Sequence, residues 1–276
     1  MLKIDNISEL RSMRRSMPGV FGLVPTMGAL HEGHTSIIRR ARLECGSLGV
    51  SIFVNPAQFG PGEDLAKYPR LIEKDMTLLE SLGVDVAWVP QPEIVYPPGY
   101  QTWIAVEEVS KPLEGANRPG HFRGVSTVVV KLFNIFTPDR AYFGQKDAQQ
   151  VAVIRRMAAD LNFPVDIVVS PTVREADGLA MSSRNAYLNE EERRAAPALY
   201  RALSAAKELF ETGERKADAI RAAVLKTLSM EPLTNLQYVS VANPDTIEEL
   251  DEIRGGALLS AAVIIGKTRL IDNILL

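Results

Sequence analysis

Short β-branched runs alternate with longer helical patterns through the first 170 residues, and this alternation constrains the fold more than any other feature. The expected strands cover residues 20–24 (closed by Pro25), 50–54, 84–89, 141–143 and 165–169. Apolar residues at helical spacing lie between them, over residues 34–43, 71–82, 125–136 and 148–161. Strands separated by helices pair in parallel, so the pattern predicts a doubly wound α/β sheet with helices on both faces. Such sheets bind ligands beyond the carboxyl ends of their strands.

A change of pattern after Arg174 predicts a second, smaller domain. Asn189 is a suitable helix N-cap, and the three glutamates that follow it suit the positive end of a helix. Ala-rich helices are then expected over residues 197–212 and 216–230, and strands over residues 236–241 and 257–265. The sequence therefore predicts a doubly wound domain over residues 1–174 and a smaller α+β domain over residues 175–276.

The composition is that of an ordinary globular protein, with 46% hydrophobic and 24% charged residues. The net charge is −3, whereas a nucleic-acid-binding protein normally carries a basic excess, so a nucleic-acid partner is not expected. The longest apolar stretch, residues 257–266, is shorter than the roughly 18 residues of a membrane helix, and the first residues lack a signal-peptide core. A single cysteine favours a reducing compartment. We therefore expect a cytoplasmic enzyme without a membrane partner.

The densest group of chemically suitable residues lies between the first strand and its helix. It comprises Pro25, Thr26, Met27, Gly28, Ala29, Leu30, His31, Glu32, Gly33 and His34. Gly28 and Gly33 permit a close approach of the backbone. His34 stands at the expected helix N-terminus, where N–H groups and the helix dipole favour a phosphate. Since an imidazole there can donate to an oxygen that gains negative charge, the segment predicts a site for phosphoryl or nucleotidyl transfer.

Two other interpretations of these histidines stay open at this point. His31 and His34 can be surface histidines of a loop. Together with His121 they can also hold one metal ion, as in a metallohydrolase, although their spacing differs from that of the zinc peptidases. The position between a strand and a helix favours phosphate binding over both.

A second turn, Gly144-Gln145-Lys146-Asp147, follows the expected strand over residues 141–143. Lys146 can neutralise phosphate charge, and Asp147 can accept from ribose hydroxyls or cap the helix. Such a sequence is by itself typical of a simple turn.

Two glutamines suit a hydroxy-carboxylate substrate. Gln58 follows the second strand, at the same end of the sheet as the first turn. Gln150 shares a helical row with Ile154 and Met157, so its amide is expected to point inward and to need polar partners. Either glutamine can also be purely structural.

A third cluster comprises Met181, Ser182, Ser183 and Arg184. Hydroxyl groups beside an arginine suit the β- and γ-phosphates of a nucleotide, although a capped surface turn has the same composition. Three separate clusters therefore suit phosphate. A nucleotide-dependent enzyme explains all three together, whereas a structural interpretation must explain each one separately.

The order of these segments resembles a known enzyme family. PTMGALHEGH is followed by VNPAQF, HFRG, GQKD and MSSRN, as in the pantothenate synthetase (pantoate–β-alanine ligase) family. The resemblance extends from Val24 to Asn273. HxGH marks only the nucleotidyltransferase superfamily, which includes class I aminoacyl-tRNA synthetases, whereas the glutamine-bearing segments and GVSTVVVKLFN are specific to this family.

The resemblance implies a fold and a reaction. The fold is a Rossmann-like doubly wound parallel sheet that binds nucleotide and pantoate, with a KMSKS-like loop in the smaller C-terminal domain. The pantoate carboxylate attacks the α-phosphorus of ATP and releases pyrophosphate, and β-alanine then displaces AMP from pantoyl adenylate to give pantothenate. The family further implies ATP and Mg²⁺ as cofactors and a homodimer.

The family also implies roles for individual residues. Residues 25–34 would form the first ATP-binding segment, in which His34, with His31, assists nucleotidyl transfer. Gly144, Gln145, Lys146 and Asp147 would hold ribose and phosphate, with Lys146 neutralising the transition state. Val173 would present backbone atoms to adenine. Met181 to Arg184 would contact ATP, with Ser182 and Arg184 on the outer phosphates.

The substrate and metal sites are implied in the same way. Gln58 and Gln150 would bind pantoate, Gln58 would also meet β-alanine, and Asn55 would belong to the same site. Asp75 is the nearest candidate for a protein contact to Mg²⁺. Gln145 replaces a glutamate found in many members, and we expect no loss of activity from this change. An aminoacyl-tRNA synthetase fragment and an inactive protein of the same fold are the remaining alternatives.

Overall fold

The computed structural model describes residues 1–276, which divide into two compact units. The first unit comprises residues 1–144 and 153–170, and the second comprises residues 145–152 and 171–276. Residues 145–152 thus belong with the C-terminal part of the chain, which a single cut at residue 174 does not anticipate. The assignment of functions to domains 1–174 and 175–276 stays a prediction.

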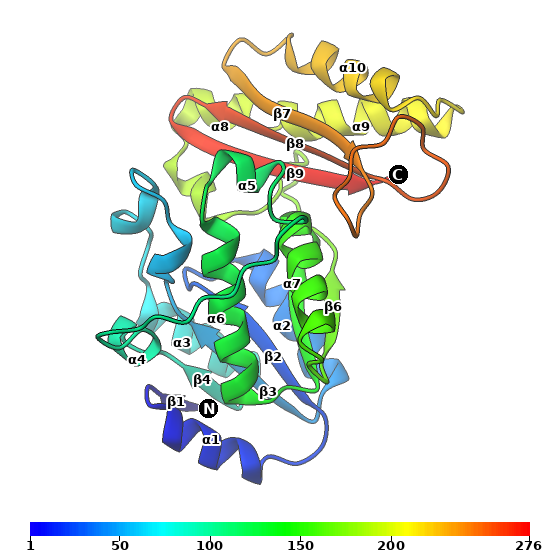
Figure 1. Ribbon diagram of the computed structural model, residues 1–276. Helices are drawn as coiled ribbons and strands as arrows, with labels where there is room; N and C mark the ends of the chain where they lie inside the picture. Colours follow the sequence, from blue (N-terminus) through cyan, green and yellow to red (C-terminus); the bar gives the residue numbers. More distant parts are fainter. The chain divides into compact units, whose positions relative to one another are not determined.

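A six-stranded parallel sheet forms the centre of the first unit (Figure 1). Its strands lie in the order β1-β4-β3-β2-β5-β6, so the direction of winding reverses between β2 and β5. The strands are β1 (Leu2–Ile4), β2 (Phe21–Thr26), β3 (Ser47–Ile52), β4 (Val86–Trp88), β5 (Arg140–Gly144) and β6 (Asp166–Ser170). The predicted doubly wound α/β sheet is therefore confirmed, and β1 is an additional edge strand.

All four predicted helices of the N-terminal region are present. They are α2 (Glu32–Glu44), α3 (Ile72–Ser81), α6 (His121–Phe136) and α7 (Ala148–Asp160). Three further helices are not predicted: α1 (Ile7–Ser16), α4 (Pro92–Val95) and α5 (Glu114–Asn117). Helix α1 escapes prediction because Leu10 is its one fully buried residue, which leaves almost no apolar stripe in the sequence.

Alternate residues of the strands point to opposite faces of this sheet. Val24 and Val50 pack with Ile38 of α2 and Leu79 of α3. On the other face the Phe21 and Phe136 rings stack with their centroids 6.1 Å apart. Both faces are therefore covered by helices, and the ends of the strands carry the connecting turns.

The strand boundaries differ from the predicted ones by one to three residues, most clearly in β2 and β3. Strand β2 does not end at Pro25 but continues through Thr26, and Pro25 lies opposite Ser51 of β3. The proline is tolerated because the neighbour on the other side, β5, pairs only with Gly22 and Leu23. Strand β3 begins at Ser47 and ends at Ile52, somewhat earlier at both ends than its β-branched signal suggests.

The second unit contains an antiparallel sheet in the order β7-β8-β9 with helices packed against it (Figure 1). The strands are β7 (Thr234–Ala242), β8 (Leu258–Ile265) and β9 (Thr268–Leu275), and the helices are α8 (Glu190–Ala195), α9 (Ala198–Glu211) and α10 (Ala217–Leu228). The core includes Leu199, Leu203 and Ile220 from the helices and Leu259 and Val263 from β8. The predicted α+β character, the two long helices and the Asn189 cap are confirmed.

Candidate active site

The turn between β2 and α2 has an unusual backbone that a buried carboxylate holds in place. Gly28 and Ala29 adopt positive φ angles of 81° and 51°. The N–H groups of Ala29 and Leu30 consequently point to one side, where they donate to Oδ2 and Oδ1 of Asp75 at 2.8 and 2.9 Å. Asp75 is only 1% exposed. An internal carboxylate therefore fills the anion-binding concavity that such successive N–H groups create.

Two histidines form the N-terminus of α2. His31 is the N-cap, and its Nδ1 accepts the N–H of Gly33 at 3.2 Å. His34 Nδ1 accepts the N–H of His31 at 3.4 Å, and the two rings lie 4.1 Å apart. Helix α2 therefore begins at Glu32, two residues earlier than expected, because His31 serves as its cap. Since Nδ1 of His34 accepts a hydrogen bond, a neutral His34 carries its proton on Nε2 and can donate it there.

Other side chains of this segment stabilise its own geometry. Thr26 Oγ1 donates to the carbonyl of Ser51 at 2.8 Å and accepts the N–H of Gly28 at 3.2 Å. Glu32 forms an ion pair with Arg39 further along α2. Thr26 thus holds the turn, Glu32 makes its ion pair within the helix, and the histidines remain the main chemical groups of the segment.

The predicted substrate residues Asn55 and Gln58 contact each other after β3. The chain there forms a 3-10 turn, η1 (Pro56–Gln58). Asn55 Nδ2 donates to Gln58 Oε1 at 3.0 Å, and Gln58 Nε2 donates to Met27 Sδ at 3.2 Å. The hydroxyl of Tyr96 donates to Asn55 Oδ1 at 2.9 Å. The amide of Gln58 is therefore oriented from both ends and lies against the first predicted ATP-binding segment.

His121 supports this turn from the first position of α6. Its Nδ1 lies 2.9 Å from the carbonyl oxygen of Gln58, and its Nε2 lies 3.1 Å from Arg118 Nη1. Because a carbonyl only accepts and a guanidinium only donates, the proton of His121 is on Nδ1. Burial, together with the positive charge of Arg118, lowers the pKa of His121 to about 4. His121 is therefore a neutral structural residue at pH 7.

Gly124 completes the support of the same turn. Its carbonyl accepts from Asn55 Nδ2 at 3.1 Å. A Cβ at this position would lie 2.2 Å from the carbonyl oxygen of Ala57, so only glycine fits. His121 and Gly124, the first and last residues of the HFRG motif, thus form a platform on α6 that contacts the turn bearing Gln58.

In the second unit, the predicted phosphate-binding turn is a 3-10 turn, η3 (Gln145–Asp147), held by strand β9. Lys146 Nζ lies 3.6 Å from Asp147 Oδ1. Gln145 Nε2 donates to Oδ1 of Asn273 at 3.0 Å. The charged groups of Lys146 and Asp147 are therefore adjacent, and Gln145 is the donor in its hydrogen bond with Asn273.

Gln150 is less buried than its predicted inward orientation suggests. Gln149 is the buried glutamine at the start of α7, whereas Gln150 is only half-buried. The helical row through Ile154 and Met157 does not decide the orientation, because consecutive residues of this helix, 151–154, are all buried. A role of Gln150 in pantoate binding stays a prediction.

The third cluster lies in a hairpin-like segment of the second unit. The N–H of Met181 donates to the carbonyl of Val173 at 3.0 Å. Ser182 caps a 3-10 turn, η4 (Ser183–Tyr187), by accepting the N–H of Arg184 on its Oγ at 3.2 Å. The structure therefore brings Val173 beside the segment that begins at Met181.

Comparison with known proteins shows the family to which the chain belongs. Residues 2–275 match the family described as pantoate-beta-alanine ligase. The chain belongs to this family. Pantothenate synthetases of Roseiflexus castenholzii and Herpetosiphon aurantiacus are 59% and 55% identical over 273 and 274 residues, which cover 99% of this chain and 98% and 99% of those proteins.

Solved structures agree with this assignment. The pantothenate synthetase of Thermus thermophilus matches with a TM-score of 0.95 and 46% identity, covering 99% of each chain. The pantoate-beta-alanine ligase of Francisella tularensis, complexed with beta-gamma ATP and beta-alanine, matches with a TM-score of 0.82 and 36% identity over 100% of this chain and 97% of that one. The chain is therefore an enzyme that ligates pantoate to β-alanine, and the synthetase-fragment and metallohydrolase interpretations are wrong.

Three features of this ligase have no counterpart among the residues that the sequence predicts for the site. Tyr96 lies in no predicted motif, and His121 was considered only as a metal ligand. Asp272 and Asn273 of β9, which contact Arg174 and Gln145, were not assigned a role. The contact of Asp75 with the histidine turn was also not predicted, although its position in an otherwise apolar helical row is a signal, since a charged residue on a buried face needs a partner.

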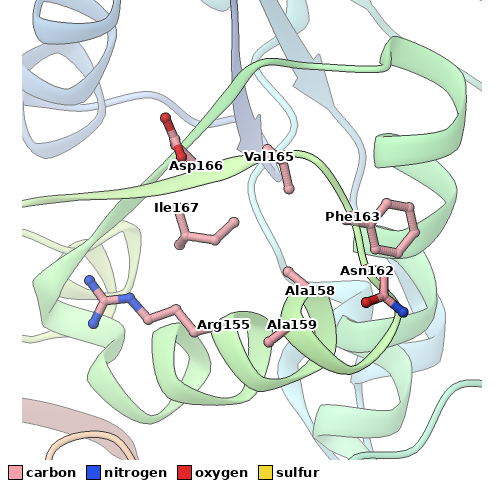
Figure 2. A pocket seen from close by; sticks show the side chains of 8 residues that line it. All are labelled: Arg155, Ala158, Ala159, Asn162, Phe163, Val165, Asp166 and Ile167. Atoms are coloured by element: carbon pink, nitrogen blue, oxygen red, sulfur yellow. The ribbon is translucent and has the colours of Figure 1, made fainter.

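Two further observations concern sites outside these segments. A surface depression of about 510 Å³ lies between α7 and β6 (Figure 2), lined by Arg155, Ala158, Ala159, Asn162, Phe163, Val165, Asp166 and Ile167. It contains none of the predicted site residues.

No group of three or more His, Cys, Asp or Glu side chains is arranged to hold a metal ion. No helix is long and apolar enough to cross a membrane.

Proposed function

We propose that this ligase activates pantoate with groups of the histidine turn and of the turn at Lys146, and that Gln58 positions pantoate for the reaction. A carboxylate is a poor acylating agent, so it must first gain a good leaving group. In the first step a pantoate carboxylate oxygen bonds to the α-phosphorus of ATP, and pyrophosphate leaves. In the second step the β-alanine nitrogen bonds to the acyl carbon, AMP leaves with the bonding electrons, and the amine gives up a proton.

The contact between Gln58 and Met27 carries this assignment. Gln58 Nε2 lies 3.2 Å from the sulfur of Met27, so the amide suited to a hydroxy-carboxylate borders the turn suited to a nucleotide. Attack on the α-phosphorus requires that the carboxylate and the nucleotide meet at such a border. The contacts of Asn55 and Tyr96 keep the Gln58 amide in one orientation.

His34 is proposed to stabilise charge during adenylation. It stands in the first turn of α2, where the helix dipole and the N–H groups favour an anion. The proton that we assign to Nε2 can be donated to a phosphate oxygen as its charge grows. His31 contributes by accepting the N–H of Gly33 and thereby fixing the N-terminus of the helix.

The turn at Lys146, Val173 and the segment from Met181 to Arg184 are also proposed to contact the nucleotide. Lys146 would neutralise charge on the phosphates, and Gly144, Gln145 and Asp147 would contact ribose and phosphate. Val173 would face adenine with its backbone. The hydroxyls and the guanidinium of Ser182, Ser183 and Arg184 would bind the outer phosphates.

Magnesium is proposed to enter with ATP rather than through a protein carboxylate. Asp75 does not suit the predicted role of direct ligand, because it is 1% exposed and both of its oxygens accept backbone N–H groups. Mg²⁺ is commonly held by nucleotide phosphates with few protein ligands. When bound there, it would neutralise phosphate charge.

We further propose a cytoplasmic homodimer. The family resemblance supports the dimer, and the free thiol of the buried Cys45 is compatible with a reducing compartment. Size-exclusion chromatography with light scattering tests the oligomeric state: a mass near 30.3 kDa would contradict the dimer.

The first experiment is to measure AMP formation from ATP and Mg²⁺ with pantoate and β-alanine, together and singly. AMP and pantothenate should appear in stoichiometric amounts only when both substrates are present. Exchange of labelled pyrophosphate into ATP should require pantoate but not β-alanine, since the adenylate forms first. Exchange that requires β-alanine would contradict the two-step order.

A further inference from the structure

The side chain of Asn273, near the end of β9, holds the turn that carries Lys146. Its Nδ2 donates to the carbonyl oxygens of Gln145 and Lys146 at 3.0 and 2.9 Å. Its Oδ1 accepts from Gln145 Nε2 at 3.0 Å. Asn273 is only 4% exposed. Both amide protons and the amide oxygen are thus used on one turn of the chain, 127 and 128 residues away in the sequence.

The neighbouring residue of β9 holds a second segment. The carboxylate of Asp272 pairs with Nη1 and Nη2 of Arg174 at 2.6 and 3.0 Å, and Arg174 Nη1 also donates to the carbonyl of Gly178 at 3.0 Å. Asp272 Oδ1 accepts the N–H of Asn273 at 2.8 Å. Asp272 and Asn273 therefore tie together the turn of Lys146 and the segment that follows Val173.

We propose that Asn273 is a positioning residue that directs Lys146 toward the nucleotide phosphates by fixing the backbone of its turn. The inference rests on the proposed role of Lys146. Asn273 itself does not touch the substrate in this proposal, and it acts only through the turn that it binds.

The physical reason is the flexibility of lysine. The ammonium group of Lys146 sits on a four-carbon stem, so its position depends on the direction in which the backbone starts that stem. Transition-state stabilisation requires a charge that is already in place when the phosphate charge develops. Two hydrogen bonds to consecutive carbonyls restrict the rotation of the turn, which a single bond would not do.

Loss of the Asn273 amide has a specific expected effect. Without it, two partly buried carbonyls of the turn lose their donor and must reorient to find another. Lys146 would then occupy several directions, and the rate of adenylate formation would fall. The affinity for pantoate would remain, because the hydrogen bonds that orient Gln58 are made with Asn55 and Met27 and do not involve this turn.

The test is a double-mutant cycle on adenylate formation in single turnover. Asn273→Ala should slow adenylation by about 10- to 100-fold with an unchanged Kd for pantoate. In a Lys146→Ala background, the same change should have little further effect, because the residue through which it acts is gone. Equal slowing in both backgrounds would overturn the inference.

A second substitution separates positioning from packing. Asn273→Asp keeps the size of the side chain but places a carboxylate oxygen against two carbonyls. It should slow adenylation at least as much as Asn273→Ala, whereas a packing role predicts that the isosteric change is milder. Asn235→Ala, an exposed asparagine on β7 of the same sheet, is the matched control and should leave the rate unchanged.

The outcomes also distinguish this inference from the proposed function. If Lys146→Ala leaves adenylation unchanged, the proposed role of Lys146 fails and the inference fails with it, although AMP release with both substrates would still establish the ligase reaction. If Lys146→Ala is impaired and Asn273→Asp is not, only the inference fails. Thermal unfolding of each variant identifies any loss of folded protein.

Discussion

Asp75 accepts the backbone N–H of Ala29 at 2.8 Å, and this contact joins a buried acid on α3 to the histidine turn. Its second oxygen accepts the next N–H, that of Leu30. Gly28 has a φ of 81°, which favours glycine, and a Cβ there would also lie only 3.0 Å from Asp75 Oδ2. Asp75, which lies outside the histidine motif, thus sets the geometry of the turn that we assign to ATP.

Substitution of Asp75 with asparagine should destabilise the protein and weaken ATP binding. One carboxylate oxygen becomes an NH₂ group that faces a backbone N–H, so a buried donor loses its acceptor at a cost of about 1–3 kcal/mol. Chemical denaturation and ATP titration measure the two effects. Glu73→Gln, an exposed position on the same helix, is the control. A variant of normal stability with a raised Mg²⁺ requirement would instead indicate that Asp75 is a metal ligand.

Replacement of His34 with alanine should slow adenylation by about 10²- to 10³-fold, because a donor to the developing phosphate charge is lost. Pyrophosphate exchange into ATP measures this step. His34→Gln retains a donor near the position of Nε2 and should recover part of the rate. A normal exchange rate for His34→Ala would remove this residue from the mechanism.

Gln58→Ala should weaken pantoate binding far more than ATP binding, because the amide is directed by Asn55 on one side and Met27 on the other. Isothermal calorimetry with each ligand separates the two affinities. Tyr96→Phe removes only the hydroxyl that holds Asn55, so it should have a smaller effect in the same direction. Equal losses for ATP and pantoate would contradict a substrate-specific role.

Much of the fold could be predicted because the sequence carries it locally. Val24 and Val50 lie in short β-branched runs between helical stripes, and this pattern is sufficient for a parallel sheet. Strand β9 escaped because Asp272 and Asn273 interrupt its apolar character, and β1 and α1 escaped because they bury few residues. The elements that the sequence does not predict are those stabilised by contacts with distant parts of the chain rather than by an apolar pattern of their own.

In the candidate site, too, local sequence features could be predicted and long-range contacts could not. The histidine turn and the turn of Lys146 could be predicted because glycine, histidine and lysine between a strand and a helix have a local chemical meaning. The contacts of Asp75 with Ala29 and of Asn273 with Gln145 span 46 and 128 residues, so no local pattern contains them. The sequence therefore predicts the groups suited to chemistry but not the long-range contacts that hold them in place.

The stability of the protein should depend on pH through His121. Burial and Arg118 hold its pKa at about 4 in the folded chain, against an ordinary value of 6.5, so the unfolded chain takes up the proton first as the pH falls. The stability contributed by neutral His121 is fully present above pH 6.5 and is lost progressively toward pH 4. Between pH 7 and pH 5 the free energy of unfolding should fall by about 2 kcal/mol from this residue.

A comparison with His121→Asn isolates this contribution. The asparagine amide can still donate to the carbonyl of Gln58 but does not titrate, and the carboxylates of Glu63 and Glu114 are common to both proteins. Denaturation at pH 7 and pH 5 should therefore show a smaller decrease for the variant. Parallel decreases would mean that His121 titrates normally in the folded chain.

Gly124→Ala tests whether the platform on α6 controls the substrate site. The added methyl group would lie 2.2 Å from the carbonyl oxygen of Ala57, so η1 must move away from α6. Overpacking of this kind costs about 1–3 kcal/mol, and here the displaced turn carries Gln58. The affinity for pantoate should therefore fall together with the stability. Gly255→Ala, where an added Cβ has no neighbour within 4 Å, should change neither. A Gly124→Ala variant that loses stability but keeps its pantoate affinity would show that Gln58 can follow the substrate without this support.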